Sequence, residues 1–220
     1  DRMSSHRNKY IEGTRMIFDL GRINSYYPIK GVIHIGAFAG EELSSYRSLG
    51  LSNTVMFEPQ PNLYNLIKER CIDEETIHNV ALGSESGTKD MYISWREGGV
   101  QNGSGASSSL LKPKQHLEDH PEVTFPETIK VEVHTLDDYY DDQFNFLNID
   151  VQGYELEVLR GGTKTLENID AMIVEVNKAE VYEGCPLVED LDEFLAKFGF
   201  NRVATTWQTD SWGDALYAKD

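Results

Sequence analysis

Residues 32–42 read Val32-Ile33-His34-Ile35-Gly36-Ala37-Phe38-Ala39-Gly40-Glu41-Glu42, and this stretch decides the fold. A short β-branched run predicts a strand, two glycines bound a turn, and the apolar spacing after Glu42 predicts a helix. Gly36 and Gly40 lack a Cβ, so the backbone can approach a ligand closely while helix-opening amides meet an anionic group. The same spacing also occurs where a helix only packs tightly on a sheet. The turn therefore indicates a nucleotide-type α/β fold but does not by itself establish a ligand site.

The composition limits the class of protein. The 220 residues, 40% of them hydrophobic, suit a single domain with one core. The formal net charge of −17 argues against nucleic acid as the main partner, because nucleic-acid-binding proteins usually present a basic face. Cys71 and Cys185 match no metal-ligand spacing and are expected to be free thiols of a reducing compartment.

The ends and apolar runs of the chain bear on its location. No apolar run approaches the roughly 20 residues of a membrane span, and no signal peptide precedes the fold. We therefore expect a cytoplasmic protein without a membrane span. Because the sequence begins at Asp1 rather than Met, we also expect a trimmed chain or one domain of a longer one.

Strands and helices alternate along most of the chain. Residues 8–27 carry a rough helical stripe that Pro28 ends, so residues 1–30 are assigned to an N-terminal helical segment and 31–220 to the main domain. The expected core strands are residues 31–36, 53–58, 76–82, 144–149, 171–176, 201–205 and 214–218. The expected helices between them are residues 41–49, 61–70, 154–160 and 187–198.

This alternation predicts an α/β fold with a Rossmann-like, doubly wound sheet of seven strands and helices on both faces. The sheet is expected to be mostly parallel. The last two strands have no helix between them, so the last strand is expected to be antiparallel.

The alternation lapses in an inserted region of about residues 84–134. Strand-like segments at 91–95 and 129–134 flank residues 98–109, which are too rich in glycine and serine for a core. A flexible linker is one interpretation. Because long loops inside compact domains are often functional, we favour a loop over the active site. Its expected substrate contacts are Ser107, Ser108 and Ser109.

Several motifs together resemble those of the FkbM family of S-adenosylmethionine-dependent (class I) methyltransferases. They are HIGAFAGEE (34–42), FEPQP (57–61), NVALG (79–83), VHTLDD (133–138), NIDVQGYELEVLRGG (148–162) and VEV (174–176). The resemblance implies a sheet with a reversed last strand and O-methylation of a hydroxyl, often on a sugar or a polyketide-like acceptor. The chain departs from the family pattern at His34, where Asp is common, and at Asn148, where Lys is common.

The resemblance implies S-adenosyl-L-methionine as the cofactor and S-adenosyl-L-homocysteine as the product. Since a carboxylate accepts two hydrogen bonds from a diol, Glu58 is expected to hold the ribose. Amides around residues 36–40 are expected to meet the cofactor's carboxylate, and Glu41 or Glu42 its amino group. The full set of expected cofactor contacts is His34, Gly36, Ala37, Phe38, Gly40, Glu41, Glu42, Glu58, Pro59, Asn79, Val80, Ala81, Asp150, Val151 and Gln152.

Asp150 and Glu175 are the expected catalytic residues, because they stand at the ends of adjacent central strands. Methyl transfer is an in-line displacement, so the site must align oxygen, carbon and sulfur, and the hydroxyl must lose its proton. Asp150 is placed first as the general base, with Glu175 orienting the acceptor and Tyr154 as a further substrate contact. His34 and His134 are interpreted as structural. A divalent metal on Asp150 and Glu175 is an alternative, but no ligand spacing supports it and none is predicted.

Other interpretations stay open on the sequence alone. Asp150 is also suited to cap a helix or contact the cofactor's amino group, and Glu175 to a structural role. An NAD-dependent oxidoreductase would use the same sheet, although Gly36 and Gly40 are not spaced G-x-G-x-x-G. A non-catalytic nucleotide-binding or interaction module would keep the fold without turnover. The preferred function is O-methyl transfer to a hydroxyl of a small molecule, with a sugar or glycan as acceptor.

Overall fold

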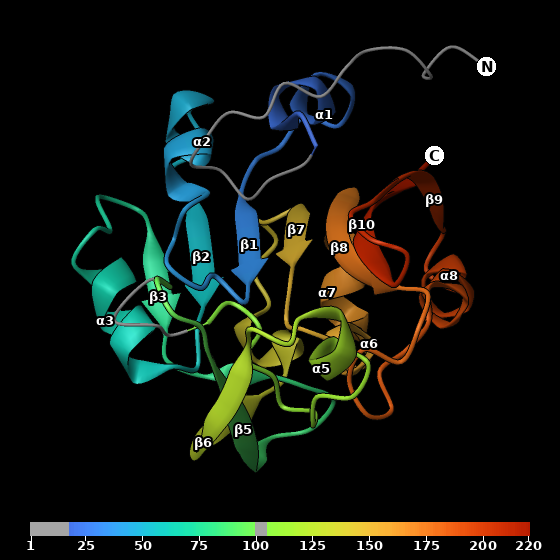
Figure 1. Ribbon diagram of the computed structural model, residues 1–220. Helices are drawn as coiled ribbons and strands as arrows, with labels where there is room; N and C mark the ends of the chain where they lie inside the picture. Colours follow the sequence, from blue (N-terminus) through green and yellow to red (C-terminus); the bar gives the residue numbers. More distant parts are fainter. Residues whose placement is uncertain (1–17, 100–104) are drawn as a thin grey trace.

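The computed structural model describes residues 18–99 and 105–220 (Figure 1). The part of the expected leading helix at residues 8–17 lies outside the described residues. Residues 100–104, within the glycine- and serine-rich segment, also lie outside them.

Within the described residues, seven strands form one sheet in the order β3-β2-β1-β7-β8-β10-β9. The strands are β1 (Val32–Ile35), β2 (Thr54–Phe57), β3 (Thr76–His78), β7 (Phe146–Ile149), β8 (Ala171–Asn177), β9 (Phe200–Trp207) and β10 (Trp212–Lys219). Neighbours from β3 to β8 pair in parallel, whereas β10 is antiparallel to both β8 and β9. The predicted fold class, including the reversed last strand, is confirmed.

Helices cover both faces of this sheet. On one face, α1 (Leu20–Tyr26), α2 (Leu43–Ser48) and α3 (Pro61–Lys68) contribute to one apolar cluster. On the other, α6 (Glu155–Arg160), α7 (Thr163–Asn168) and α8 (Val188–Ala196) contribute to the second. Strands β1, β2, β7 and β8 are therefore buried along their whole length, as expected for continuous apolar runs in a parallel sheet.

A second, three-stranded sheet is built from the inserted region, again counting only described residues. It contains β4 (Ala81–Leu82), β5 (Gly87–Trp95) and β6 (Thr124–His134), in the order β4-β6-β5. Two short helices, α5 (His116–Asp119) and the 3-10 helix η1 (Leu136–Tyr139), flank β6 in the chain. Figure 1 shows β5 and β6 beyond the ends of β1 and β2 toward which the arrows point. The inserted region therefore adjoins the edge where ligands of such sheets bind.

The single strand expected for residues 76–82 is wrong. The chain leaves the main sheet after His78, and Ala81 and Leu82 pair with β6 instead. The Asn79 side chain fixes this change of sheet, because its Nδ2 donates to the carbonyls of Glu58 and Pro59 at 2.9 and 3.0 Å.

A helix missed by the sequence follows the expected one at 154–160. α6 ends at Gly161, but α7 begins at Thr163. The carboxylate of Asp137 accepts hydrogen bonds from the Lys164 and Thr165 amides at 3.0 and 2.8 Å. A side chain in η1 thus caps α7, which local sequence does not reveal. Among the described residues, no helix is long and apolar enough to cross a membrane.

Candidate active site

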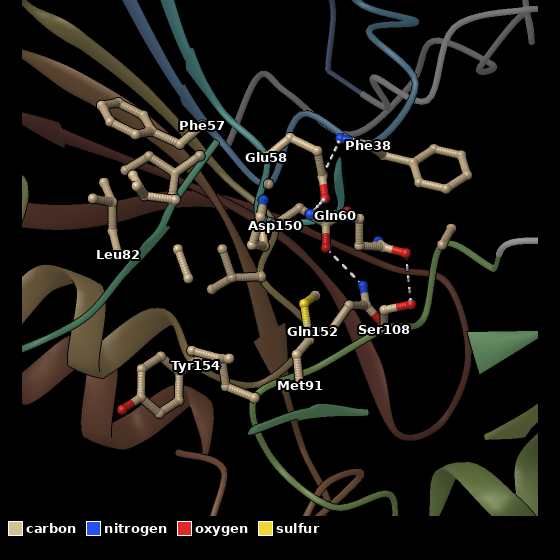
Figure 2. Close-up of a pocket in the computed structure, with 18 residues that line it drawn as sticks. Phe38, Phe57, Glu58, Gln60, Leu82, Met91, Ser108, Asp150, Gln152 and Tyr154 are labelled. Carbon is tan, nitrogen blue, oxygen red and sulfur yellow. Dashed lines mark hydrogen bonds between the residues drawn. The ribbon is translucent and has the colours of Figure 1, made fainter. Parts of the chain in front are cut away.

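A pocket lies at the carboxyl ends of β1, β2 and β7, facing the second sheet (Figure 2). It holds about 530 Å³ of empty space, including the part open to solvent. The apolar wall includes Phe57, Val80, Ala81, Leu82, Met91 and Leu110. The polar side chains on it are Glu58, Gln60, Ser108, Asp150, Gln152 and Tyr154. A largely apolar pocket with a few convergent polar groups has the character of a small-molecule site.

A second pocket of about 430 Å³ adjoins the first and shares Gly36, Phe38 and Asp150 with it. Its wall also includes residues from β1, the turn, and the neighbouring strands: His34, Ala37, Glu41, Glu42, Asn148, Ile173 and Asp214. Most expected cofactor contacts therefore line one pocket or the other. Gly40 and Asn79 line neither pocket. A Cβ at Gly40 would face Ile67 and Leu43, and the Asn79 side chain donates to the Glu58 and Pro59 carbonyls that follow β2.

The glycine turn is fixed by contacts within the chain. Gly36 has a φ of 82°, and a Cβ there would lie 1.9 Å from the Asp150 carbonyl oxygen. The amides of Gly36 and Ala37 both donate to the Phe57 carbonyl, at 3.0 and 3.1 Å. The Phe38 amide donates to Glu58. Several amides expected to meet a ligand carboxylate thus already have acceptors, and they fasten the turn to β2.

Glu58 is a buried carboxylate at the end of β2, with 3% of its surface exposed. Its Oε2 accepts the Phe38 amide and its Oε1 the Gln60 amide, both at 2.9 Å (Figure 2). These bonds fix the orientation of the carboxylate. A carboxylate fixed in this way presents hydrogen-bond acceptors at the wall of the pocket.

The expected substrate serines hold the inserted segment in place. Ser107 donates its amide to the Ser94 hydroxyl at 3.1 Å, and Ser109 donates its hydroxyl to the Gln152 carbonyl at 2.6 Å. Only Ser108 lines the pocket, where its hydroxyl lies 3.4 Å from Gln60 Oε1. Tyr154 also lines the pocket, and burial raises the pKa of its phenol.

Asp150 and Glu175 lie in one hydrogen-bonded cluster. Gln152 Nε2 donates to Asp150 Oδ1 at 2.6 Å and to Glu175 Oε2 at 2.9 Å. The two acids also hydrogen-bond to each other, and burial together with the charge of Asp150 raises the pKa of Glu175 well above its usual range. The raised pKa means that the protonated form of Glu175 is favoured over its charged form relative to a carboxyl in water. Burial likewise raises the pKa of the neighbouring Glu155 to about 8.

The two departures from the family pattern are neighbours. His34 on β1 is the register partner of Asn148 on β7. Both contact the Tyr46 hydroxyl of α2, His34 Nδ1 at 3.2 Å and Asn148 Nδ2 at 3.0 Å. His34 therefore belongs to a buried polar group under the turn and also lines the second pocket. His134 instead contacts Tyr139 and Glu132, at 2.6 and 2.7 Å, outside both pockets.

Sequence reasoning missed several residues around the site. Gln60 stands within the FEPQP motif, which was a usable signal. Met91, Leu110 and Asp214 reach the pockets from distant segments, and Tyr182 hydrogen-bonds Gln152 from the loop after β8. Over residues 18–99 and 105–220, no group of three or more His, Cys, Asp or Glu side chains is arranged to hold a metal ion.

Comparisons with known proteins agree on one family. Residues 34–202 match the model of the methyltransferase FkbM domain. A curated relative, the 2-O-methyltransferase NoeI of Sinorhizobium fredii (strain NBRC 101917 / NGR234), is 29% identical over 180 residues, covering 76% of this chain and 74% of NoeI. A solved FkbM methyltransferase from Methylobacillus flagellatus KT superposes with a TM-score of 0.56 at 18% identity. That match covers 86% of this chain, which spans only 43% of the solved protein.

Proposed function

The chain belongs to the FkbM methyltransferase family, and from this premise we propose that it is an S-adenosylmethionine-dependent O-methyltransferase acting on a hydroxyl of a sugar or glycan. The observation that carries this proposal is the buried Glu58 carboxylate, fixed at the end of β2 on the wall of an apolar pocket. The relative's name, a 2-O-methyltransferase, supports an oxygen acceptor.

The residues present fit S-adenosylmethionine. Glu58 would accept hydrogen bonds from the ribose hydroxyls, and Val80 and Leu82 offer apolar surface to the adenine. The second pocket would take the amino-acid end, with Glu42 near its amino group. When bound, S-adenosylmethionine supplies a methyl group whose bond to sulfur breaks as the acceptor oxygen attacks, the electron pair staying on sulfur in S-adenosylhomocysteine.

Asp150 is our general base. It lines both pockets, so a hydroxyl placed between them would lie beside it. In this role Asp150 takes the proton that leaves the acceptor hydroxyl. Glu175, whose side chain shares the Gln152 amide with Asp150, holds the acceptor and the Asp150 side chain in place. We also propose that the described parts of the inserted region, residues 84–99 and 105–134, form one wall of the closed pocket, since Met91, Ser108 and Leu110 line it.

The test is methyl transfer by the purified chain. The chain is incubated with S-adenosylmethionine and a panel of methyl glycosides, and S-adenosylhomocysteine and methylated sugar are followed by mass spectrometry. The proposal expects both products to form together on at least one glycoside. Methylation of a non-sugar hydroxyl alone would overturn the acceptor class. A folded chain that binds S-adenosylhomocysteine yet methylates no hydroxyl would overturn the reaction.

A further inference from the structure

Gln152 occupies a backbone conformation that needs support. It follows β7 with a φ of 55°, in the left-handed region that non-glycine residues seldom adopt. Its carbonyl accepts the Ser109 hydroxyl, and the amides on either side, Val151 and Gly153, both donate to Glu155 Oε1 at 3.1 Å. Such conformations persist where surrounding contacts hold them, and they cluster at functional sites.

The side-chain amide of Gln152 forms hydrogen bonds at both its nitrogen and its oxygen. Its Nε2 carries two hydrogens and has two acid partners, Asp150 Oδ1 at 2.6 Å and Glu175 Oε2 at 2.9 Å. Figure 2 shows this side chain directed toward Asp150. The other end of the amide, Oε1, accepts the Tyr182 hydroxyl at 2.8 Å. One amide therefore connects two strand ends to the loop after β8.

Tyr182 binds the oxygen end of the Gln152 amide. Its side chain is fully buried, and its ring lies against His116 with centroids 5.5 Å apart. The hydroxyl carries one hydrogen and faces two carbonyl-type acceptors, Gln152 Oε1 and the Ser107 backbone oxygen at 2.9 Å. Burial raises the pKa of Tyr182 well above its usual range, so the phenol remains a donor. A hydroxyl donor on one side and two carboxyl oxygens on the other select one orientation of the amide.

We propose that Tyr182 and Gln152 are positioning residues for methyl transfer: Tyr182 orients the Gln152 amide, and that amide keeps Asp150 as the ready base beside Glu175. The assignment of Asp150 as base rests on the proposed function, whereas the geometry of the four side chains does not. A hydrogen bond donated to a carboxylate favours its charged form. Loss of the Gln152 donor is therefore expected to make the charged form of the Asp150–Glu175 pair less favourable.

Other charged and titratable groups also face this pair and enter any pH profile. Glu155 lies beneath it on α6 and Asp214 beside Glu175 on β10. His34, Glu41 and Glu42 share the second pocket with Asp150. All of these groups are present in both variants. Differences between the variants therefore report on the Tyr182 hydroxyl and the Gln152 amide.

The experiment compares Gln152→Asn, Tyr182→Phe and the unchanged chain. Asparagine tolerates the left-handed backbone, but its amide is one methylene too short to reach both acids. Tyr217→Phe is the matched control, because Tyr217 is equally buried and its hydroxyl donates to Asp192, outside both pockets. Circular dichroism establishes that each variant is folded. Side-chain carboxyl carbons of Asp150 and Glu175 are then titrated by NMR, with methyl transfer measured over the same pH range.

We expect the shared carboxyl titration of the Asp150–Glu175 pair and the acidic limb of kcat to move up by about one pH unit in Gln152→Asn. The shift in Tyr182→Phe is smaller and in the same direction, and Tyr217→Phe shows none. Unchanged carboxyl titrations in both Gln152→Asn and Tyr182→Phe would overturn the inference. The NMR titration needs no acceptor substrate, so it tests the positioning role of Gln152 and Tyr182 even if no hydroxyl is methylated. Absence of methylation would count against the proposed function alone.

Discussion

The carbonyl oxygen of Asp150 lies 1.9 Å from where the Cβ of any side chain at position 36 would stand, so Gly36 and Asp150 fit together only because residue 36 is glycine. The turn after β1 and the end of β7 are thereby packed backbone to backbone. Glycine is kept here for close approach as well as for its positive φ.

Gly36→Ala is expected to destabilise the fold by on the order of 3 kcal/mol or more, because the alanine Cβ displaces the Asp150 backbone. Gly50→Ala is the matched control. Gly50 also has a positive φ, 72°, but nothing lies within 4 Å of its Cβ position, so only about 1–2 kcal/mol is lost. Urea unfolding compares the two. Equal losses would show that backbone conformation alone, and not the contact with Asp150, requires the glycine.

Asp150→Asn is expected to lower kcat by roughly 10²–10⁴-fold, because an amide cannot take the proton of the acceptor hydroxyl. Binding of S-adenosylhomocysteine, measured by calorimetry, should change little, since the Glu58 end of the pocket is untouched. Glu175→Gln is the comparison, and its loss of kcat should be smaller. An Asp150→Asn chain with near-normal turnover would remove Asp150 from the role of base.

Two buried asparagines, Asn177 at the end of β8 and Asn145, differ in their side-chain hydrogen bonds. Asn177 is 1% exposed, and within the described part of the chain neither of its side-chain polar atoms has a hydrogen-bond partner. Asn177→Leu should therefore leave stability unchanged or raise it. Asn145→Leu should cost about 2–3 kcal/mol, because Asn145 bonds the Lys30 amide, the Pro28 carbonyl and Asp170. Chemical denaturation measures both, and a large loss at Asn177 would mean that the amide has structural partners.

His116 is expected to make the fold less stable in acid. It is buried, and burial together with the charge of His120 lowers its pKa to about 4. The unfolded chain takes up this proton near pH 6.5 and the folded chain only near pH 4, so stability falls as pH is lowered between these values. Relative to His116→Phe, the unchanged chain should lose about 2 kcal/mol across that window. Unfolding curves that keep a constant difference between the two proteins would contradict this.

The fold was largely predictable because its strands are continuous apolar runs separated by clear turn signals. The 171–176 run, for example, is buried on both faces, and its composition alone indicates a central strand. The break within residues 76–82 was not predictable, because it depends on Asn79 reaching the carbonyls of Glu58 and Pro59. The start of α7 was also hidden, since Asp137 caps it from a distant segment.

The candidate site was predictable where chemistry coincides with a strand end. Glu58 and Asp150 were identified this way, and both line the pocket. Tyr182 carried no such signal, because its contact with Gln152 depends on how the loop after β8 folds back. Likewise, serine composition could not distinguish a residue that lines the pocket, Ser108, from one whose hydroxyl binds the backbone, Ser109.

Calorimetric titration with S-adenosylhomocysteine tests whether the Glu58 pocket binds S-adenosylmethionine. The unchanged chain is titrated beside Glu58→Ala, with NAD as a second ligand. Glu75→Ala is the matched control, because Glu75 is also buried and accepts a backbone amide, from Ile72 at 3.0 Å, but lies outside both pockets. We predict micromolar binding of S-adenosylhomocysteine, weakened about tenfold or more by Glu58→Ala and unchanged by Glu75→Ala, with no binding of NAD. A folded chain that binds NAD instead, or that binds no S-adenosylhomocysteine, would contradict the account.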